Sequence, residues 1–64
     1  MKYKVRFITK SNNTIMGVVD TNLDILAYMD EIKRCKWYIF NDPGSGAVTV
    51  VNMENVEFFK IELA

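Results

Sequence analysis

The segment TNLDILAYMDEIKRCK, residues 21–36, decides the fold, because it is the one stretch of the 64-residue chain with the periodicity of an amphipathic helix. Thr21 and Asp24 have the spacing of a capping box, in which both side chains accept hydrogen bonds from backbone N–H groups at the helix start. Apolar side chains then recur every three or four residues and predict one stripe facing a sheet: Ile25, Tyr28, Met29, Ile32 and Cys35.

Strand-like runs lie on both sides of this helix. Aromatic, β-branched or alternating residues, which favour strands, occur in five segments: residues 2–9, 14–19, 37–40, 47–51 and 56–63. The connections within each half are too short for a parallel crossover. We therefore expect an α+β fold of one domain, residues 1–64, with an antiparallel sheet of four to five strands in the order β-β-α-β-β-β and the helix packed across one face.

The strand expected at residues 14–19 has apolar side chains on both faces. Ile15 and Val19 lie on one face, and Met16 and Val18 on the other. This pattern predicts a strand inside the sheet or covered on its second side. Gly17 is expected opposite the first strand or at a bulge.

The small size of the chain points to self-association. A lone core below roughly 70 to 80 residues supplies little net stability. The single cysteine cannot form an internal disulfide, and the absence of histidine puts the usual metal sites out of reach. Oligomerisation is the remaining way to stabilise so small a fold. Because 50% of the residues are hydrophobic, the chain has apolar surface for it, and we expect a homodimer.

More apolar side chains are present than one small core can cover. Three of them flank the helix stripe, and three more lie on the strands of the second half. The interface with a second copy or with another protein is expected among these six residues: Leu23, Leu26, Ala27, Tyr38, Phe40 and Phe58. The helix flank is the first choice, and the aromatic side chains Tyr38 and Phe58 are the second.

Catalytic chemistry lacks its usual groups in this sequence. Without histidine there is no Ser-His or Cys-His nucleophile pair and no imidazole general base. Cys35 lies on the predicted core stripe, which indicates a small buried hydrophobe. The pairs Glu54 with Glu57 and Asp30 with Glu31 come with no predicted pocket. We expect no enzyme activity, no metal and no cofactor.

The glycine-rich stretch NDPGSG at residues 41–46 is a hairpin turn by its composition. A phosphate-binding loop leads into a helix N-terminus, whereas this stretch leads into the strand sequence AVTVV.

A basic cluster supports an alternative function. Lys2, Lys4, Arg6 and Lys10 lie on or beside the first strand, where lysines can also guard a sheet edge against aggregation. Tyr3 and Phe7 alternate with these cations and point the other way, whereas base stacking requires aromatic side chains on the same exposed face. Eight basic and eight acidic residues give zero net charge, so no overall field attracts nucleic acid.

The chain carries no pattern for export or membrane insertion. Its start lacks the apolar run of a signal peptide, and no stretch approaches the roughly 20 apolar residues of a membrane span. A lone cysteine suits a reducing compartment. We expect a cytoplasmic protein without a membrane partner.

The order of these features also resembles a known group of proteins. It comprises the basic first strand, the short capped helix, the strand WYIF and an ending VN-x-x-NV-x-x-F-x-I, formed here by Val51, Asn52, Asn55, Val56, Phe59 and Ile61. In this order of features the chain is similar to small accessory proteins of bacteriophages and Gram-positive bacteria. The resemblance implies an inhibitor that binds and blocks a host protein, such as a component of a CRISPR, Thoeris or Hachiman defence system.

The function expected from the sequence is therefore a non-enzymatic, homodimeric protein-binding module that inhibits or regulates a host protein. The alternative is a nucleic-acid-binding regulator that uses the basic first strand.

Overall fold

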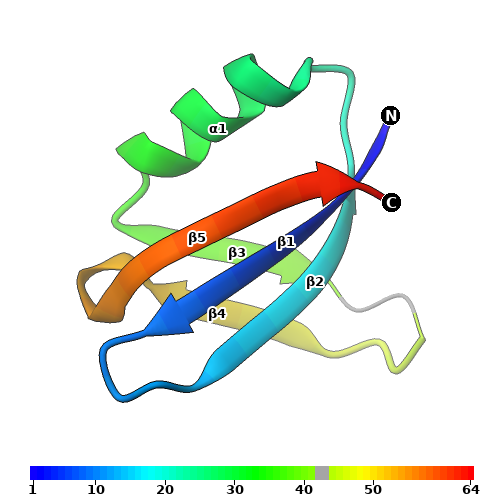
Figure 1. Cartoon of the computed structure of the whole chain (residues 1–64). Helices are drawn as coiled ribbons and strands as arrows, with labels where there is room; N and C mark the ends of the chain where they lie inside the picture. Colours follow the sequence, from blue (N-terminus) through cyan, green and yellow to red (C-terminus); the bar gives the residue numbers. More distant parts are fainter. Residues whose placement is uncertain (42–43) are drawn as a thin grey trace.

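The computed structural model describes residues 1–41 and 44–64, which form five strands, one α-helix and one 3₁₀ turn (Figure 1). The elements are β1 (Lys2–Thr9), β2 (Thr14–Asp20), α1 (Ile25–Arg34), β3 (Trp37–Asn41), β4 (Val48–Asn52), the 3₁₀ turn η1 (Met53–Asn55) and β5 (Val56–Leu63). The predicted fold class and the order β-β-α-β-β-β are confirmed.

The strands form two antiparallel sheets, where the sequence predicted one. The first has the order β2-β1-β5 and the second consists of β3 and β4. Figure 1 shows the cause: after β2 the chain crosses to α1, and β3 begins in a second layer behind the first sheet. The helix lies over the open side between the two layers.

Strands β3 and β4 pair as an antiparallel hairpin, with Trp37 opposite Asn52 at one end and Asn41 opposite Val48 at the other. This pairing agrees with the predicted turn between the two strands. That turn includes Asp42 and Pro43, which lie outside the described residues.

An aromatic core joins the two layers. Phe7 of β1 is fully buried, and its ring centroid lies 5.5 Å from that of Tyr38 and 6.4 Å from that of Phe40, both on β3. Tyr3 stacks on Tyr28 of the helix at 5.8 Å. Each such pair contributes about 0.5 to 1.5 kcal/mol beyond the burial of its area, so these ring contacts stabilise the packing of sheet on sheet and of sheet on helix.

Gly17 lies where the second sheet comes closest to the first. It pairs with Val5 in an uninterrupted β1–β2 register, so the alternative placement at a bulge is wrong. A Cβ atom at this position would overlap the ring of Phe40. The missing side chain is therefore the space that the Phe40 ring occupies.

The central strand of the larger sheet is β1, because β5 returns beside it. The expectation that residues 14–19 form an inner or doubly covered strand is wrong: β2 is an edge, and Met16 and Val18 are exposed. The role of the β1 lysines as guards of a sheet edge is likewise wrong, since β1 has a neighbour on each side.

The helix is shorter than predicted and begins after Asp24. The Asp24 carboxylate accepts a hydrogen bond from the Ala27 N–H at 2.8 Å, which makes Asp24 the N-cap. Thr21 does not cap the helix, because its hydroxyl accepts from the Leu23 N–H in the preceding loop. Of the predicted stripe, Tyr28 and Ile32 are buried and Met29 and Cys35 are half-buried, whereas the placement of Ile25 against the core is wrong because its side chain is exposed.

Gly17→Ala tests the contact between the layers. The added methyl must displace the Phe40 ring, so we expect the free energy of unfolding to fall by about 1 to 3 kcal/mol in urea denaturation followed by circular dichroism. Phe40→Leu makes the opposing side chain smaller. It should lower the free energy of unfolding by less in the Gly17→Ala protein than in the wild type. Strict additivity of the two changes would contradict the contact.

Asp24→Ala tests the helix start. Loss of the cap should lower the free energy of unfolding by about 0.5 to 2 kcal/mol. Thr21→Ala is the matched control. It should lower the free energy of unfolding by less, because the Thr21 hydroxyl accepts a hydrogen bond only within the loop before the helix. An equal or larger cost for Thr21→Ala would restore Thr21 as the cap.

Candidate interaction surfaces

Of the groups considered for catalysis, Cys35 and Glu57 line one hollow of about 450 Å³ between the helix end and β5, without a hydrogen bond between them among the described contacts. Asp30 is paired with Arg34 at 2.9 Å, and Glu54 and Glu57 are exposed. Cys35 is half-buried against the core, and its thiol donates to the backbone oxygen of Glu31. Among residues 1–41 and 44–64, no group of three His, Cys, Asp or Glu side chains could hold a metal ion. The same residues contain no helix of the length and apolar character that a membrane crossing requires.

A group of four exposed apolar side chains lies on the side of β3 and β4 that points away from the core. We call this surface the β3–β4 outer face; by register and alternation it consists of Trp37, Ile39, Asn41, Val48, Val50 and Asn52. Its apolar members are all more than half exposed: Trp37 53%, Ile39 61%, Val48 59% and Val50 52%. Ile39 lies directly opposite Val50, so the patch is continuous across the hairpin.

This face results from two strands that are apolar at nearly every position. In WYIF, either Tyr38 and Phe40 or Trp37 and Ile39 can face the core, and the other pair must face outward. The expected exposure of Tyr38 and Phe40 is wrong, because they are 8% and 7% exposed. Burial also raises the pKa of Tyr38, since its ionised form would lose its water.

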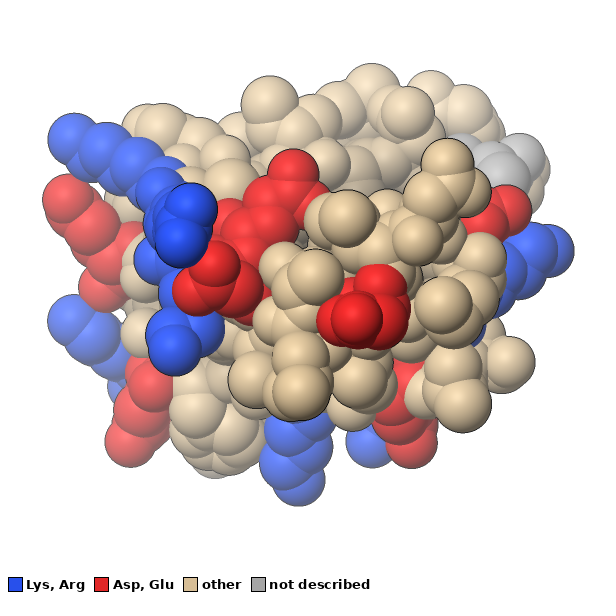
Figure 2. Space-filling view, turned by 90° about the horizontal axis from the view of Figure 1, so that it is seen from above, with Lys and Arg blue, Asp and Glu red and all other residues tan. Residues whose placement is uncertain are grey.

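The helix flank is exposed as the sequence predicts. Leu26 is 70% exposed, and Leu23 and Ala27 beside it are also exposed. Figure 2, a view onto the helix side, shows charged side chains at the left, in the centre, along the lower part and at the right, and mostly uncharged side chains along the upper part. Phe58, the remaining predicted interface residue, is 46% exposed on β5.

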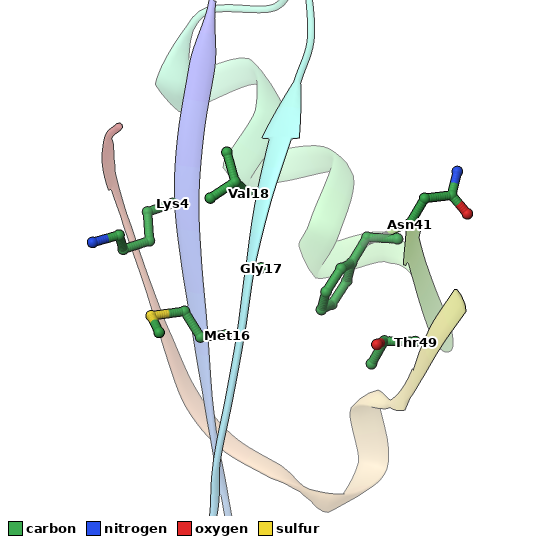
Figure 3. A pocket seen from close by; sticks show the side chains of 7 residues that line it. Lys4, Met16, Gly17, Val18, Asn41 and Thr49 are labelled. Carbon is green, nitrogen blue, oxygen red and sulfur yellow. The ribbon is translucent and has the colours of Figure 1, made fainter. Parts of the chain in front are cut away.

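A hollow of about 290 Å³ lies at the edge of β2, over Gly17 and Phe40. Figure 3 shows Lys4, Met16 and Val18 on one side of β2, and Asn41 and Thr49 on the other. The hollow therefore lies at a strand edge, between side chains of β1 and β2 and the ring of Phe40. Its volume is also just below the roughly 300 to 1,000 Å³ typical of small-molecule sites.

Comparison of the chain with protein families, with curated proteins and with solved structures finds no match.

Self-association through the helix flank stays a prediction of the sequence. Light scattering of the purified protein at tens of micromolar should give the mass of two chains. Leu26→Asp should give a folded monomer, because an unpaired carboxylate in a dimer interface is costly. Ile39→Asp, a similar change on the β3–β4 outer face, is the control and should leave the dimer intact. A wild-type mass of one chain would end this idea.

Proposed function

We propose that the protein is a non-enzymatic protein-binding module that holds its partner on the β3–β4 outer face. The observation that carries the proposal is the continuous patch of Trp37, Ile39, Val48 and Val50, each more than half exposed. None of the six described residues of this face is charged. Exposed apolar patches of this kind mark interaction sites on small domains.

The shape and chemistry of the face fit a protein partner. A two-stranded sheet offers a flat surface, whereas small-molecule sites are concave. Phosphate groups require cations, and this face carries none among its described residues. Tryptophan is enriched among the residues that dominate binding energy at protein interfaces, usually near the centre of the contact. Trp37, the single tryptophan of the chain, is therefore the expected anchor.

The size of the patch sets a limit on the affinity it can provide. Full burial of one such side chain contributes about 1.5 to 3 kcal/mol, so burying the exposed half of four contributes on the order of 3 to 6 kcal/mol. Association costs about 4 to 15 kcal/mol in lost freedom of motion. A stable complex therefore needs contacts around the patch as well, and the uncharged Asn41 and Asn52 at its ends can supply hydrogen bonds.

The class of partner we propose is a host protein, which the module occludes. This part rests on the resemblance to small bacteriophage accessory proteins. A partner that presents an apolar surface of its own, such as a subunit interface, matches the chemistry of the face. Occupying such an interface would block assembly of the host protein without any catalytic group on the module.

Ile39→Asp tests the proposed surface. Affinity capture from a bacterial lysate should retain a protein on the wild type and lose it on Ile39→Asp. With the purified partner, Trp37 emission should shift to shorter wavelength on binding, because the half-exposed indole becomes buried. The affinity should change little between about 50 and 200 mM salt, unlike binding to phosphates.

Two controls make this test specific. Leu26→Asp places the same carboxylate at another exposed aliphatic residue, outside the β3–β4 outer face, and should leave partner binding intact. Ile39→Thr keeps a β-branched residue in the strand and should weaken binding while preserving the fold. A shift of Trp37 emission with the concentration of the protein alone, without a captured partner, would assign the face to a second copy and contradict the proposal.

A further inference from the structure

The outer surface of the sheet β2-β1-β5, on the other side of the molecule from the β3–β4 outer face, carries a different chemistry. Register places Arg6 of β1 between Met16 on β2 and Lys60 on β5. The next row of the same surface holds Ile8 between Thr14 and Phe58. These six side chains line a hollow of about 400 Å³, which we call the Arg6–Lys60 hollow.

The two cations of this hollow are cross-strand neighbours. Like charges directly opposite each other in an antiparallel pair destabilise the sheet. Glu62 offsets part of this charge, since its carboxylate lies 3.4 Å from Arg6, but both side chains of that pair are substantially exposed and the pair is weak. In the described part of the chain Lys60 has no ion-pair partner. A bound anion between Arg6 and Lys60 would relieve the repulsion.

An exposed aromatic ring lies beside these cations. The Lys60 ammonium is 5.9 Å from the centroid of the Phe58 ring, and Phe58 is 46% exposed. Glu62 lies in the row on the far side of Arg6 from Phe58, next to Lys4. The ring and the two cations therefore face the same hollow, and Glu62 lines a neighbouring hollow together with Arg6 and Lys60.

We infer that the Arg6–Lys60 hollow binds a nucleotide unit of single-stranded nucleic acid, with a base stacked on Phe58 and its phosphate between Arg6 and Lys60. Base stacking on an aromatic platform beside a basic track is the general mode of single-strand recognition. Ile8 and Met16 give the base an apolar floor.

This site differs from the one expected from the basic first strand. Lys2 and Lys4 continue the row of Arg6 at about 7 Å intervals, but Asp20 and Glu62 oppose them on the neighbouring strands. Lys10 lies in the turn after β1. Two residues of β5 complete the site. Lys60 supplies the second cation, and Phe58 supplies the exposed aromatic side chain that β1 lacks.

Fluorescence anisotropy with a short fluorescein-labelled oligothymidylate at low salt tests the inference. The wild type should bind, and the logarithm of its affinity should fall with the logarithm of the salt concentration. Phe58→Leu should lower the affinity about 5- to 150-fold through lost stacking, whereas Phe58→Tyr should bind like the wild type. Lys60→Glu should weaken binding and reduce the salt slope by about 0.7 for the lost phosphate contact.

The matched control is Lys36→Glu, which makes the same charge change on an exposed lysine after the helix. It should bind like the wild type. Absence of binding at low salt would overturn the inference, as would equal losses in Lys36→Glu and Lys60→Glu, or an unchanged affinity in Phe58→Leu. Ile39→Asp should leave oligothymidylate binding intact, so the result is independent of the proposed protein-binding surface.

Discussion

The close approach of Phe40 to Gly17 is the contact on which the rest of the structure depends. It brings β3 against β2 at the one inward position of β2 that has no side chain. Phe7 of the central strand then contacts Tyr38 and Phe40 from the other layer. A larger residue at position 17 must displace the Phe40 ring, which packs against the fully buried ring of Phe7.

The contact between Phe40 and Gly17 also determines which side chains of β3 face the solvent. Because side chains alternate along a strand, placing Phe40 and Tyr38 inward forces Trp37 and Ile39 outward. One helix can cover only the open side between two small sheets, so the outer surface of each sheet remains open to solvent. The two surfaces differ in chemistry: one is uncharged and apolar, and the other combines Arg6 and Lys60 with an aromatic ring. The proposed protein contact and the inferred nucleotide site follow from this difference.

Local periodicity was enough to predict the five strands, the helix and the exposure of Leu23, Leu26, Ala27 and Phe58. It could not predict the orientation of WYIF, because both faces of that segment are apolar and only the distant Gly17 distinguishes them. The Arg6–Lys60 hollow was missed for a similar reason. It depends on the pairing of β1 with β5, which joins the two ends of the chain. Thr21 and Asp24 are both suitable caps by type, and the tertiary position of the loop selects Asp24.

The orientation of β3 can be measured directly by nuclear Overhauser effects in the folded protein. The structure predicts strong effects between the Hα protons of Gly17 and the ring protons of Phe40, together with ring-current shifts of those Hα resonances. Trp37 and Ile39 should show no such effects to Gly17. Contacts from Gly17 to Ile39, with the Phe40 ring in solvent, would place the opposite face of β3 in the core and contradict the account.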